Sequence, residues 1–494
     1  MHRKYLLLRF FKWIFVLPLL GIIIYNTLSC KSTQPIPDHP SRDERIPWNE
    51  EYFIRFSKAL KFKTISYSSS DLSPEYSEVP FKDFNNFLEE SFPLIYKTVD
   101  VVKIGDYSRI YKWSPKKPSS RKPIMFMAHI DVVPPGDLKH WKYPPFSGKI
   151  TNDEIWGRGA LDDKHCLMGI LEAVEYAIKQ KIEPTRDIYF TFGIDEEIGG
   201  DMGAGRVAKY MAKHGINLEL LVDEGFAMIN GTHAYLNRPV AVVGISEKGI
   251  LNLDLEIKAP GGHASIPPPS TAIGRMSRAI VALEDNPMPM SISGLNKELL
   301  RKLAPELSWP YRVLLSNLKL SSYFLKYILS KSPFLNAFFR TTLATTLISG
   351  GNARNVLPTY ASARINMRIA PQDTTEMVYQ HVNSVVQSVD PDITVQCQKR
   401  VEPNSFKDPN NNVFLNFSKV IRSIYPDVPV IPGVFVATTD TNHFLELTDY
   451  VYRFTPITLT LDSMNTIHNF NERIPKQSYM NIINFYFQLI IQMG

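Results

Sequence analysis

Apolar and polar positions follow two different periods along this chain. Residues 124–127, 187–193 and 220–222 form short, mostly apolar runs of the kind that buried strands have. Between the first two runs, apolar residues from 167 to 178 recur on one helical stripe. This alternation of strands with helices extends over residues 48–248 and predicts an α/β sheet layered with helices.

The period changes at Gly249. Residues 249–258 alternate between apolar and polar side chains, which indicates a sheet with one face in water. The pattern then predicts a helix, two strands, a second helix and a last strand, over residues 271–283, 342–348, 360–369, 375–389 and 393–398. The resulting β-α-β-β-α-β order is typical of a ferredoxin-like layer. The chain therefore combines a layered α/β part with a smaller α+β part.

A long segment, residues 286–340, separates the first helix of this smaller part from its second strand. It is rich in Leu, Phe, Tyr and Ser, and it predicts helices over residues 295–303, 311–329 and 332–339. Added core for a larger domain would explain it. A wall for an acyl chain, or a patch that rests on a membrane, would explain it as well. The sequence leaves these interpretations open.

The first thirty residues predict an export signal or a membrane anchor. Basic residues at positions 3, 4, 9 and 12 precede an apolar run over residues 13–28, as in a secretory signal. Ser29 and Cys30 follow directly and resemble a loose lipoprotein cleavage site, which would attach lipid to Cys30. The alternative is an uncleaved signal anchor. In both cases we expect the rest of the protein outside the cytoplasm, tethered by a polar linker over residues 31–45.

Composition excludes several classes of function. The net charge is +6 over 494 residues, and basic and acidic residues are interspersed. Because no basic block is interleaved with aromatic residues, nucleic acid is not an expected partner. Three cysteines, Cys30, Cys166 and Cys397, are too few for a disulfide framework. Cys166 lies on the apolar helical stripe and is expected in the core.

Metal-binding side chains follow each of the three apolar runs. His129 and Asp131 end the first run, the pair Glu196–Glu197 follows the second, and Asp223–Glu224 follows the third. Tandem acidic residues after a buried strand are costly unless a positive charge lies nearby. A solvated loop explains one such pair well, but three in succession poorly. Because the carboxyl ends of parallel strands meet at one edge of a sheet, the pattern predicts a single crevice that binds a divalent metal.

Six motifs occur in the order in which the M20 family of dinuclear zinc peptidases carries them. They are His-x-Asp at 129–131, GRGALDDK at 157–164, the Glu-Glu pair at 196–197, LVDEG at 221–225, GGHAS at 261–265 and IHNFNE at 467–472. Two further phrases, TDTNHF at 439–444 and VYRFTPI at 451–457, resemble the branch of carboxypeptidase S and the N-fatty-acyl-amino-acid hydrolase/synthases. The resemblance covers the chain from about residue 48 onward.

The resemblance implies a domain plan. A catalytic α/β domain with a mixed central sheet is interrupted by a ferredoxin-like lid, through which the family dimerises. The expected segments are the signal or anchor at 1–30, the linker at 31–45, the first catalytic part at 46–248, the lid at 249–400 with its helical insertion at 286–340, and the second catalytic part at 401–494.

The resemblance also implies two zinc ions per chain. Asp162 would bridge them, His129 and Asp223 would complete one metal, and Glu197 and His468 the other. Asp131 would hold the imidazole of His129 in orientation. Asp163 would shape the turn, since the peptide bond between this pair of residues is often cis in the family.

Catalytic roles follow from the same comparison. Glu196 would be the general base, and His263 would reach into the partner subunit and stabilise the oxyanion, although a histidine beside glycines is also an ordinary surface turn residue. Arg368 and Asn355 would hold the substrate's carboxylate and carbonyl, with a plain strand-edge charge as the alternative for Arg368. Asn442 stands where relatives usually carry arginine, which leaves substrate preference open.

The expected function is hydrolysis of an amide bond next to a free carboxylate. A carboxypeptidase and an N-acyl-amino-acid hydrolase both fit, so the substrate is a peptide or an N-acyl amino acid. A dipeptidase or aminopeptidase on the same scaffold is the alternative. A binding protein that has lost catalysis is disfavoured because the metal ligands and Glu196 are all present.

Overall fold

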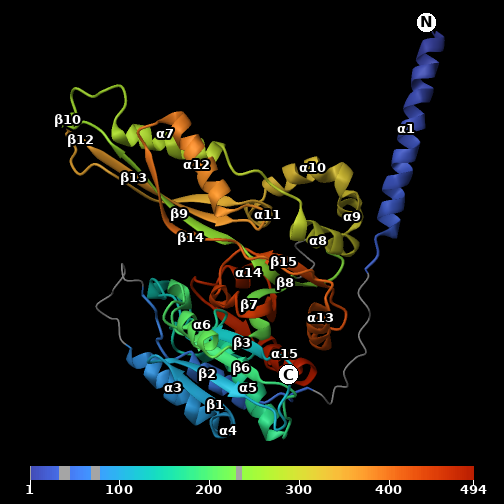
Figure 1. The fold of residues 1–494 in the computed structure, drawn as a ribbon, viewed down its shortest axis with the longest axis vertical. Coiled ribbons are helices and arrows are strands. Elements are labelled where there is room, and N and C mark those ends of the chain that lie inside the picture. The colour runs from blue at the N-terminus through green and yellow to red at the C-terminus, as the bar shows by residue number, and fades with distance from the viewer. Residues whose placement is uncertain (1, 33–44, 68–77, 230–235) are drawn as a thin grey trace.

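The computed structural model describes residues 2–32, 45–67, 78–229 and 236–494. A catalytic body carries a lid on one side and a long N-terminal helix on the other (Figure 1). The body is built on an eight-stranded sheet in the order β1 (Asp100–Ile104), β2 (Ser108–Trp113), β6 (Ile188–Gly193), β3 (Ile124–His129), β7 (Leu218–Ile229), β16 (Thr448–Leu459), β8 (Val240–Glu247) and β15 (Val430–Phe435). The central pairs β6–β3, β3–β7, β7–β16 and β8–β15 are parallel, whereas β1–β2 and β2–β6 are antiparallel. This mixed sheet flanked by helices confirms the predicted fold class.

Alternation along the buried strands divides the core between the two faces of the sheet. Phe126, Phe190 and Val222 belong to the larger core cluster, whereas Met125 and Leu221 belong to a second, smaller one. Because neighbouring side chains on a strand point to opposite faces, each strand contributes to both. The helices of the larger cluster are α2 (Glu50–Ala59), α3 (Val79–Ser91), α4 (Pro93–Thr98), α5 (Lys164–Lys179), α13 (Asn412–Ile424) and α15 (Lys476–Met493), and α6 (Ala204–Lys213) belongs to the smaller one.

The apolar stripe of α5 packs against α15, the last helix of the chain. Leu167, Ile170, Leu171 and Val174 are fully buried there. A Cβ atom on Gly169 would lie 2.5 Å from Ile482 Cγ2, so glycine at this position permits the close approach of the two helices. The last helix is therefore part of the same core as the strands that precede the lid.

The lid contains a four-stranded antiparallel sheet in the order β11 (Thr342–Gly350), β13 (Tyr360–Ile369), β9 (Gly249–Lys258) and β14 (Thr394–Val401). Alternate residues of β9 are fully buried against helices α7 (Ala272–Asp285) and α12 (Thr375–Val389), which is the packing that its sequence alternation predicts. At the tip of the lid, β10 (Gly262–His263) pairs with β12 (Val356–Leu357). The lid follows β8 with only Lys248 between the two strands.

The segment between α7 and β11 forms four helices: α8 (Gly294–Leu303), α9 (Trp309–Ser316), α10 (Leu318–Ser330) and α11 (Pro333–Phe339). The single helix predicted over residues 311–329 is wrong, because the chain leaves the helical conformation at Asn317. These helices share an apolar cluster with Val240 and Val242 of β8 and Ile431 of β15. The insertion therefore covers one edge of the catalytic sheet and adds core to the body.

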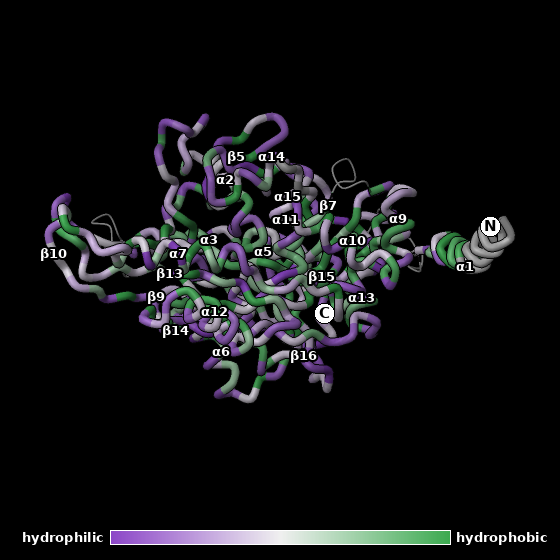
Figure 2. Tube along the Cα trace, turned by 90° about the horizontal axis from the view of Figure 1, so that it is seen from above, coloured by the Kyte–Doolittle hydropathy of each residue, from purple (hydrophilic) through white to green (hydrophobic). Residues whose placement is uncertain are grey.

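The N-terminal helix α1 (His2–Ser29) contacts α9 near its carboxyl end and otherwise extends away from the body. Seen from above, α1 and the lid tip lie at opposite ends of the molecule (Figure 2). Among the residues that the structure describes, no helix has the length and hydropathy required to cross a membrane. Most of the linker predicted at residues 31–45 lies outside the described residues.

Candidate metal centre

Four of the five predicted metal ligands meet near the carboxyl ends of β3 and β6, beside the middle of β7. His129 ends β3, Glu197 lies in a 3₁₀ turn (Glu196–Ile198) after β6, and Glu224 lies in β7. Asp162 precedes α5, and His468 comes from the loop before β17 (Arg473–Pro475). This edge of the sheet is the expected position for a site in an open α/β fold.

Two groups of three ligand atoms share Asp162. In the first group, His129 Nε2 lies 2.9 Å from Asp162 Oδ1 and 3.4 Å from Glu224 Oε1. In the second, His468 Nε2 lies 2.8 Å from Asp162 Oδ2 and 3.1 Å from Glu197 Oε2. Within each group the ligand atoms lie within 4.8 Å of one another. The two oxygens of Asp162 thus face different groups, which is the arrangement of a carboxylate that bridges two ions.

The third member of the first group is Glu224, whereas the sequence comparison assigned Asp223. Strand β7 continues past both residues, so their side chains leave it in different directions. Asp223 Oδ1 accepts a hydrogen bond from the Glu224 amide at 2.9 Å. Glu224 therefore lies within the group of His129 and Asp162 in this structure, and the assignment of Asp223 as a ligand stays a prediction.

The donor set fits divalent cations on grounds of charge. Glu197 Oε1 is buried without a hydrogen-bond partner among the described residues. Burial raises the pKa of Glu224 to about 8 and that of Asp223 to about 6. Seven acidic side chains at or beside the two groups outnumber the histidines: Asp131, Asp162, Glu196, Glu197, Asp223, Glu224 and Asp440. Such a concentration of buried negative charge is what bound metal ions would neutralise.

Asp131 connects the histidine ligand to the turn that carries both glutamates. Its side chain is fully buried and accepts hydrogen bonds from the amides of Glu196 at 3.1 Å and Glu197 at 3.2 Å. His129 Nδ1 lies 3.4 Å from Asp131 Oδ1 and 3.0 Å from its backbone carbonyl oxygen. The hydroxyl of Ser66, a residue that no sequence pattern singled out, donates to Asp131 Oδ2 at 2.6 Å. Asp131 thus positions groups from two strands at once.

Glu196 lies beside the ligand Glu197 but belongs to neither three-residue group. Burial is the main cause that raises the pKa of Glu196 well above its ordinary value, with Glu224 and Asp440 adding to it and His129 opposing it. Asp440, in the TDTNHF motif, fits between two glycines: Cβ atoms on Gly193 and Gly200 would lie 2.2 and 2.0 Å from its carboxylate oxygens. Glycine at both positions is therefore required by this buried carboxylate.

Glu472 holds the loop that presents Asp162. Its Oε1 accepts hydrogen bonds from the amides of Leu161 at 2.6 Å and Asp162 at 3.1 Å. Its Oε2 accepts from the Gly159 amide at 3.0 Å and from Arg158 Nη1 at 2.7 Å. The carboxylate is fully buried, and burial raises its pKa. The IHNFNE motif contains Glu472, but sequence reasoning assigned a role only to its histidine.

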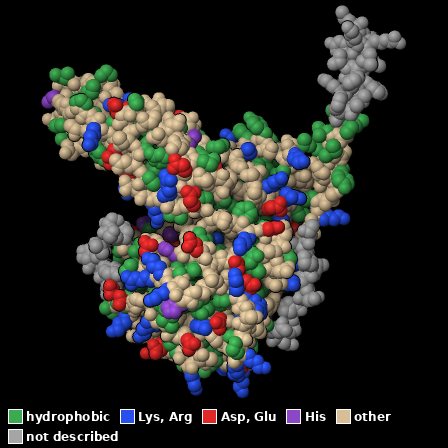
Figure 3. Space-filling model, viewed as in Figure 1, with side chains coloured by type: hydrophobic (Ala, Val, Ile, Leu, Met, Phe, Trp, Pro, Cys, Tyr) green, Lys and Arg blue, Asp and Glu red, His purple; other side chains and the backbone are tan. Residues whose placement is uncertain are grey.

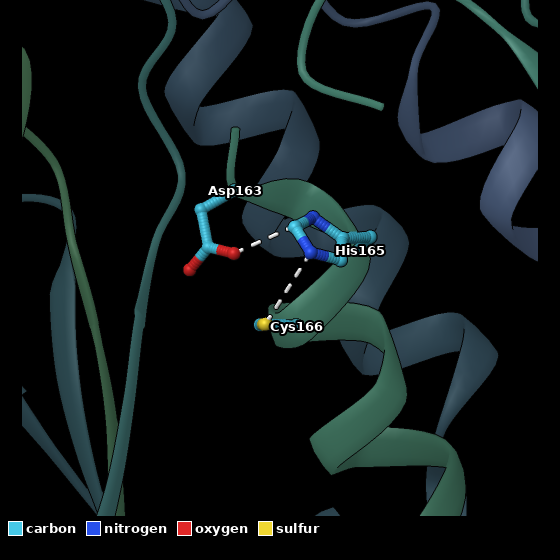
Figure 4. Close-up of side chains that lie close together, drawn as sticks. All are labelled: Asp163, His165 and Cys166. Atoms are coloured by element: carbon cyan, nitrogen blue, oxygen red, sulfur yellow. Dashed lines mark hydrogen bonds and ion pairs between the residues drawn. The ribbon is translucent and has the colours of Figure 1, made fainter. Parts of the chain in front are cut away.

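The peptide bond between Asp162 and Asp163 is cis, as the resemblance implied. Asp163 lies with His165 and Cys166 of α5 in a separate group (Figure 4). His165 Nδ1 lies 3.4 Å from Asp163 Oδ1, and its Nε2 lies 3.6 Å from Cys166 Sγ. The two partners face different ring nitrogens. Burial raises the pKa of Asp163 and Cys166 and lowers that of His165 to about 3, so burial favours the uncharged form of each side chain.

The lid residues lie apart from this centre within one chain. His263 is exposed at the tip, where its Nδ1 lies 2.7 Å from Ser265 Oγ, and the Asn355 carbonyl oxygen accepts a hydrogen bond from the Ala264 amide. Arg368 lies at the opposite end of β13, with Nη1 3.4 Å from Thr438 Oγ1, two residues before Asp440. The structure thus places Arg368 beside a loop of the catalytic body, and His263 with Asn355 at the far end of the lid.

Comparison with known families identifies the scaffold. The profile described as Peptidase family M20/M25/M40 matches residues 125–492. The chain belongs to peptidase family M20. It is therefore a hydrolase of a metallopeptidase family, as its motifs implied, and the candidate ligand groups described above lie within the matched region.

Relatives at higher identity cover most of the chain. It is 37% identical over 479 residues to "Probable carboxypeptidase S-like 2" from Dictyostelium discoideum, covering 96% of this chain and 91% of that protein. It is 35% identical over 442 residues to "N-fatty-acyl-amino acid synthase/hydrolase PM20D1" from Xenopus tropicalis, covering 87% and 84%. This family assignment confirms the resemblance stated from the motifs.

Solved structures share the fold at low identity. The M20 family metallo-carboxypeptidase Sso-CP2 from Sulfolobus solfataricus superimposes with a TM-score of 0.64 at 19% identity, covering 90% of this chain and 99% of that one. Human carnosine dipeptidase 1 gives a TM-score of 0.63 at 15% identity, covering 90% and 96%. At such identities the likeness establishes the fold alone.

Proposed function

We propose that this M20 hydrolase uses two zinc ions to cleave amide bonds next to a free carboxylate, as a carboxypeptidase or an N-acyl-amino-acid hydrolase. The observation that carries the proposal is the pair of three-ligand groups joined by Asp162. A carboxylate can bridge two ions, whereas a neutral imidazole cannot, and histidine with carboxylates suits zinc. The proposed ligands are His129, Asp162, Glu197 and His468, and the fifth is Asp223, as first predicted, or its neighbour Glu224, which lies beside His129.

The zinc pair would supply Lewis-acid activation of the carbonyl and of the attacking water. Glu196 is free to accept a proton from that water because it fills no ligand position. Its raised pKa, caused mainly by burial, suits a group that must keep the proton and then deliver it to the leaving amine. Asp131 orients His129 and the turn of Glu196 through its hydrogen bonds. The base and the ligands are thus held by one buried carboxylate.

Substrate class is supported by the relatives and by one lid residue. The names of the two most similar relatives described above refer to carboxypeptidase S and to N-fatty-acyl amino acids, and both substrate types carry a free carboxylate. Arg368 is half-buried and has no carboxylate partner among the described residues, so it is available to the carboxylate of a substrate. Asn442, in place of the usual arginine, donates to the Thr439 carbonyl oxygen. Arg453 also contacts this loop, but it is buried and paired with Glu247, whereas Arg368 has no such pairing among the described residues.

A second chain would complete the site. His263 and Asn355 are exposed at the tip of the lid, where they can reach a partner subunit but lie away from the metal groups of their own chain. In a symmetric homodimer formed through the lid, each site would borrow His263 to stabilise the oxyanion and Asn355 to hold the substrate carbonyl. We place the enzyme outside the cytoplasm, exported by residues 1–30 and retained there by lipid on Cys30 or by α1 itself.

Glu196→Gln tests the base assignment. The exchange preserves size and removes only the proton acceptor, so turnover should fall about 10²–10⁴-fold while the chain still binds zinc. Glu197→Gln is the matched control, since it should lower zinc content as well as activity. Zinc loss in Glu196→Gln, or activity within a few-fold of the unmodified enzyme, would remove Glu196 from this role.

A substrate panel tests the reaction class. Purified enzyme should cleave N-acyl amino acids or N-terminally blocked dipeptides with a free carboxylate, and a chelator should abolish the reaction. The corresponding amides, which lack the carboxylate, should react poorly. Preference for dipeptides with a free amino terminus would favour the dipeptidase alternative, which is considered because human carnosine dipeptidase 1 shares the fold.

A further inference from the structure

The helical insertion presents an apolar stripe to solvent. On α10, the side chains of Leu320, Tyr323, Phe324 and Tyr327 are 55%, 89%, 54% and 59% exposed. Their spacing of three, one and three residues places them on one face of the helix. The opposite side of α10 is anchored in the body, where Leu325 and Leu329 are buried. Helix α10 therefore has two apolar faces: one packs into the core of the body, and the other, the stripe, is exposed to solvent.

The segment that contains this stripe carries basic residues and no acidic ones. Residues 307–340 contain no Asp or Glu, and they contain five basic residues: Arg312, Lys319, Lys326, Lys331 and Arg340. Lys331 Nζ lies 4.9 Å from the centre of the Tyr327 ring. Aromatic side chains flanked by lysines are typical of helices that lie in the interface of an anionic bilayer. Figure 3 shows apolar and basic side chains side by side near the base of α1.

The N-terminal helix joins the same surface. Asn26 Nδ2 donates to Asn317 Oδ1 at 2.9 Å, and Asn317 Nδ2 donates to the buried Thr27 hydroxyl at 3.3 Å. Arg312 donates to the backbone carbonyl oxygen of Cys30. Leu17, Leu20 and Tyr25 of α1 are exposed, so α1 and α10 both present uncovered apolar side chains. A lipid on Cys30 or a retained α1 would hold α10 close to the bilayer.

We propose that the stripe on α10, with the lysines around it, is a docking surface for an anionic lipid bilayer. A second copy of this chain is the weaker occupant, because an isologous contact would bring Lys319 and Lys326 of both copies together without an acidic partner on this segment. The inference does not depend on the proposed reaction, since docking requires neither zinc nor Glu196.

A fluorescent label on the stripe tests contact directly. Tyr323→Cys, in a chain with Cys30→Ser and Cys397→Ser, would carry an environment-sensitive fluorophore, since Cys166 is buried. Vesicles of phosphatidylcholine and phosphatidylserine with brominated acyl chains should quench this label. The matched control is Met377→Cys on α12, which is 54% exposed and should stay unquenched. Because the label reports α10 itself, binding through α1 alone would leave position 323 unquenched and would overturn the proposal.

The charge dependence gives a second measurement. Lys319→Ser, Lys326→Ser and Lys331→Ser should each weaken partition into these vesicles about fivefold. Lys209→Ser and Lys213→Ser on α6, whose positions are also exposed, should leave partition unchanged. All these variants should hydrolyse a water-soluble substrate at the unmodified rate. If the α10 variants change the oligomeric state while partition stays the same, a second chain covers the stripe and the lipid proposal is wrong.

Discussion

Glu472 should control both stability and metal binding, although its carboxylate belongs to neither group of candidate ligands. Its two oxygens accept four hydrogen bonds, two each, from three backbone amides and Arg158. Glu472→Gln retains one oxygen and turns the other into an amide donor. Two of the four buried donors therefore lose their acceptor, and the Arg158 guanidinium, only 2% exposed, loses its counter-charge.

The magnitude follows from these contacts. Each buried donor left without an acceptor costs about 1–3 kcal/mol, and removal of one partner from a buried ion pair costs about 3–5 kcal/mol. Since these costs overlap at Arg158, we expect a loss of about 3–5 kcal/mol in the free energy of unfolding. The amide of Asp162 is one of the four donors, so the loop that presents this ligand should also loosen. Loss of such a supporting contact typically lowers metal affinity about 10–100-fold.

Zinc titration of the apo-enzyme and thermal denaturation of apo and zinc-loaded protein measure the two effects. Glu154→Gln is the matched control, because Glu154 also pairs with an arginine, Arg473, but its side chain is 34% exposed. Such a partly exposed pair contributes about 0–1 kcal/mol. If Glu472→Gln binds zinc and unfolds as the unmodified chain does, then its carboxylate does not hold the Asp162 loop, and the reasoning is refuted.

Three further predictions concern other parts of the chain. If Cys30 carries a lipid, Cys30→Ala should abolish membrane attachment, whereas an uncleaved signal anchor should be unaffected; cell fractionation measures the difference. Finding the unmodified protein soluble in the cytoplasm would contradict both models. His263→Ala should lower kcat about 10²–10³-fold with zinc content unchanged. Mixing this variant with Glu196→Gln should restore activity, because one site of a mixed dimer then has both an intact base and an intact histidine. If the subunits exchange and no activity returns, the shared-site model is wrong. Burial, and to a lesser extent the charge of Arg368, lowers the pKa of Lys248 from 10.5 to about 7. Between these two pH values the unfolded chain binds more protons than the folded one, so the free energy of unfolding should rise with pH. Denaturant titrations at pH 7, 8 and 9 should show this rise, and Lys248→Met should remove it.

The fold was predictable where one local pattern decides the structure. The alternating residues of β9 and the apolar stripe of α5 specify their elements because burial on one face imposes a period. The break at Asn317 was missed, because the side chain of Asn317 bonds to Thr27 and Asn26 of α1, nearly 300 residues away in sequence. No local pattern reports such a contact.

The candidate site shows the same division. The order of motifs predicted which segments meet, and the structure brings His129, Asp162, Glu197 and His468 together. Asp223 and Glu224 are neighbours within β7, so their side chains leave it on opposite sides, and the sequence alone does not report that Glu224 is the one beside His129. Ser66 lies in a stretch without periodicity and acts only through Asp131, so nothing in the sequence distinguishes it from a surface serine.

The order of the central sheet has a consequence for synthesis of the protein. Strand β16, residues 448–459, pairs with both β7 and β8, which are made more than 200 residues earlier. His468, Glu472 and α15 come later still. A growing chain can form β3, β6 and the lid, but β16 and the candidate ligand His468 are added only when residues 448–494 are made. Metal binding should therefore come late in maturation, because a chain cut short before residue 448 would lack His468 and would join β7 to β8 only through their short direct pairing.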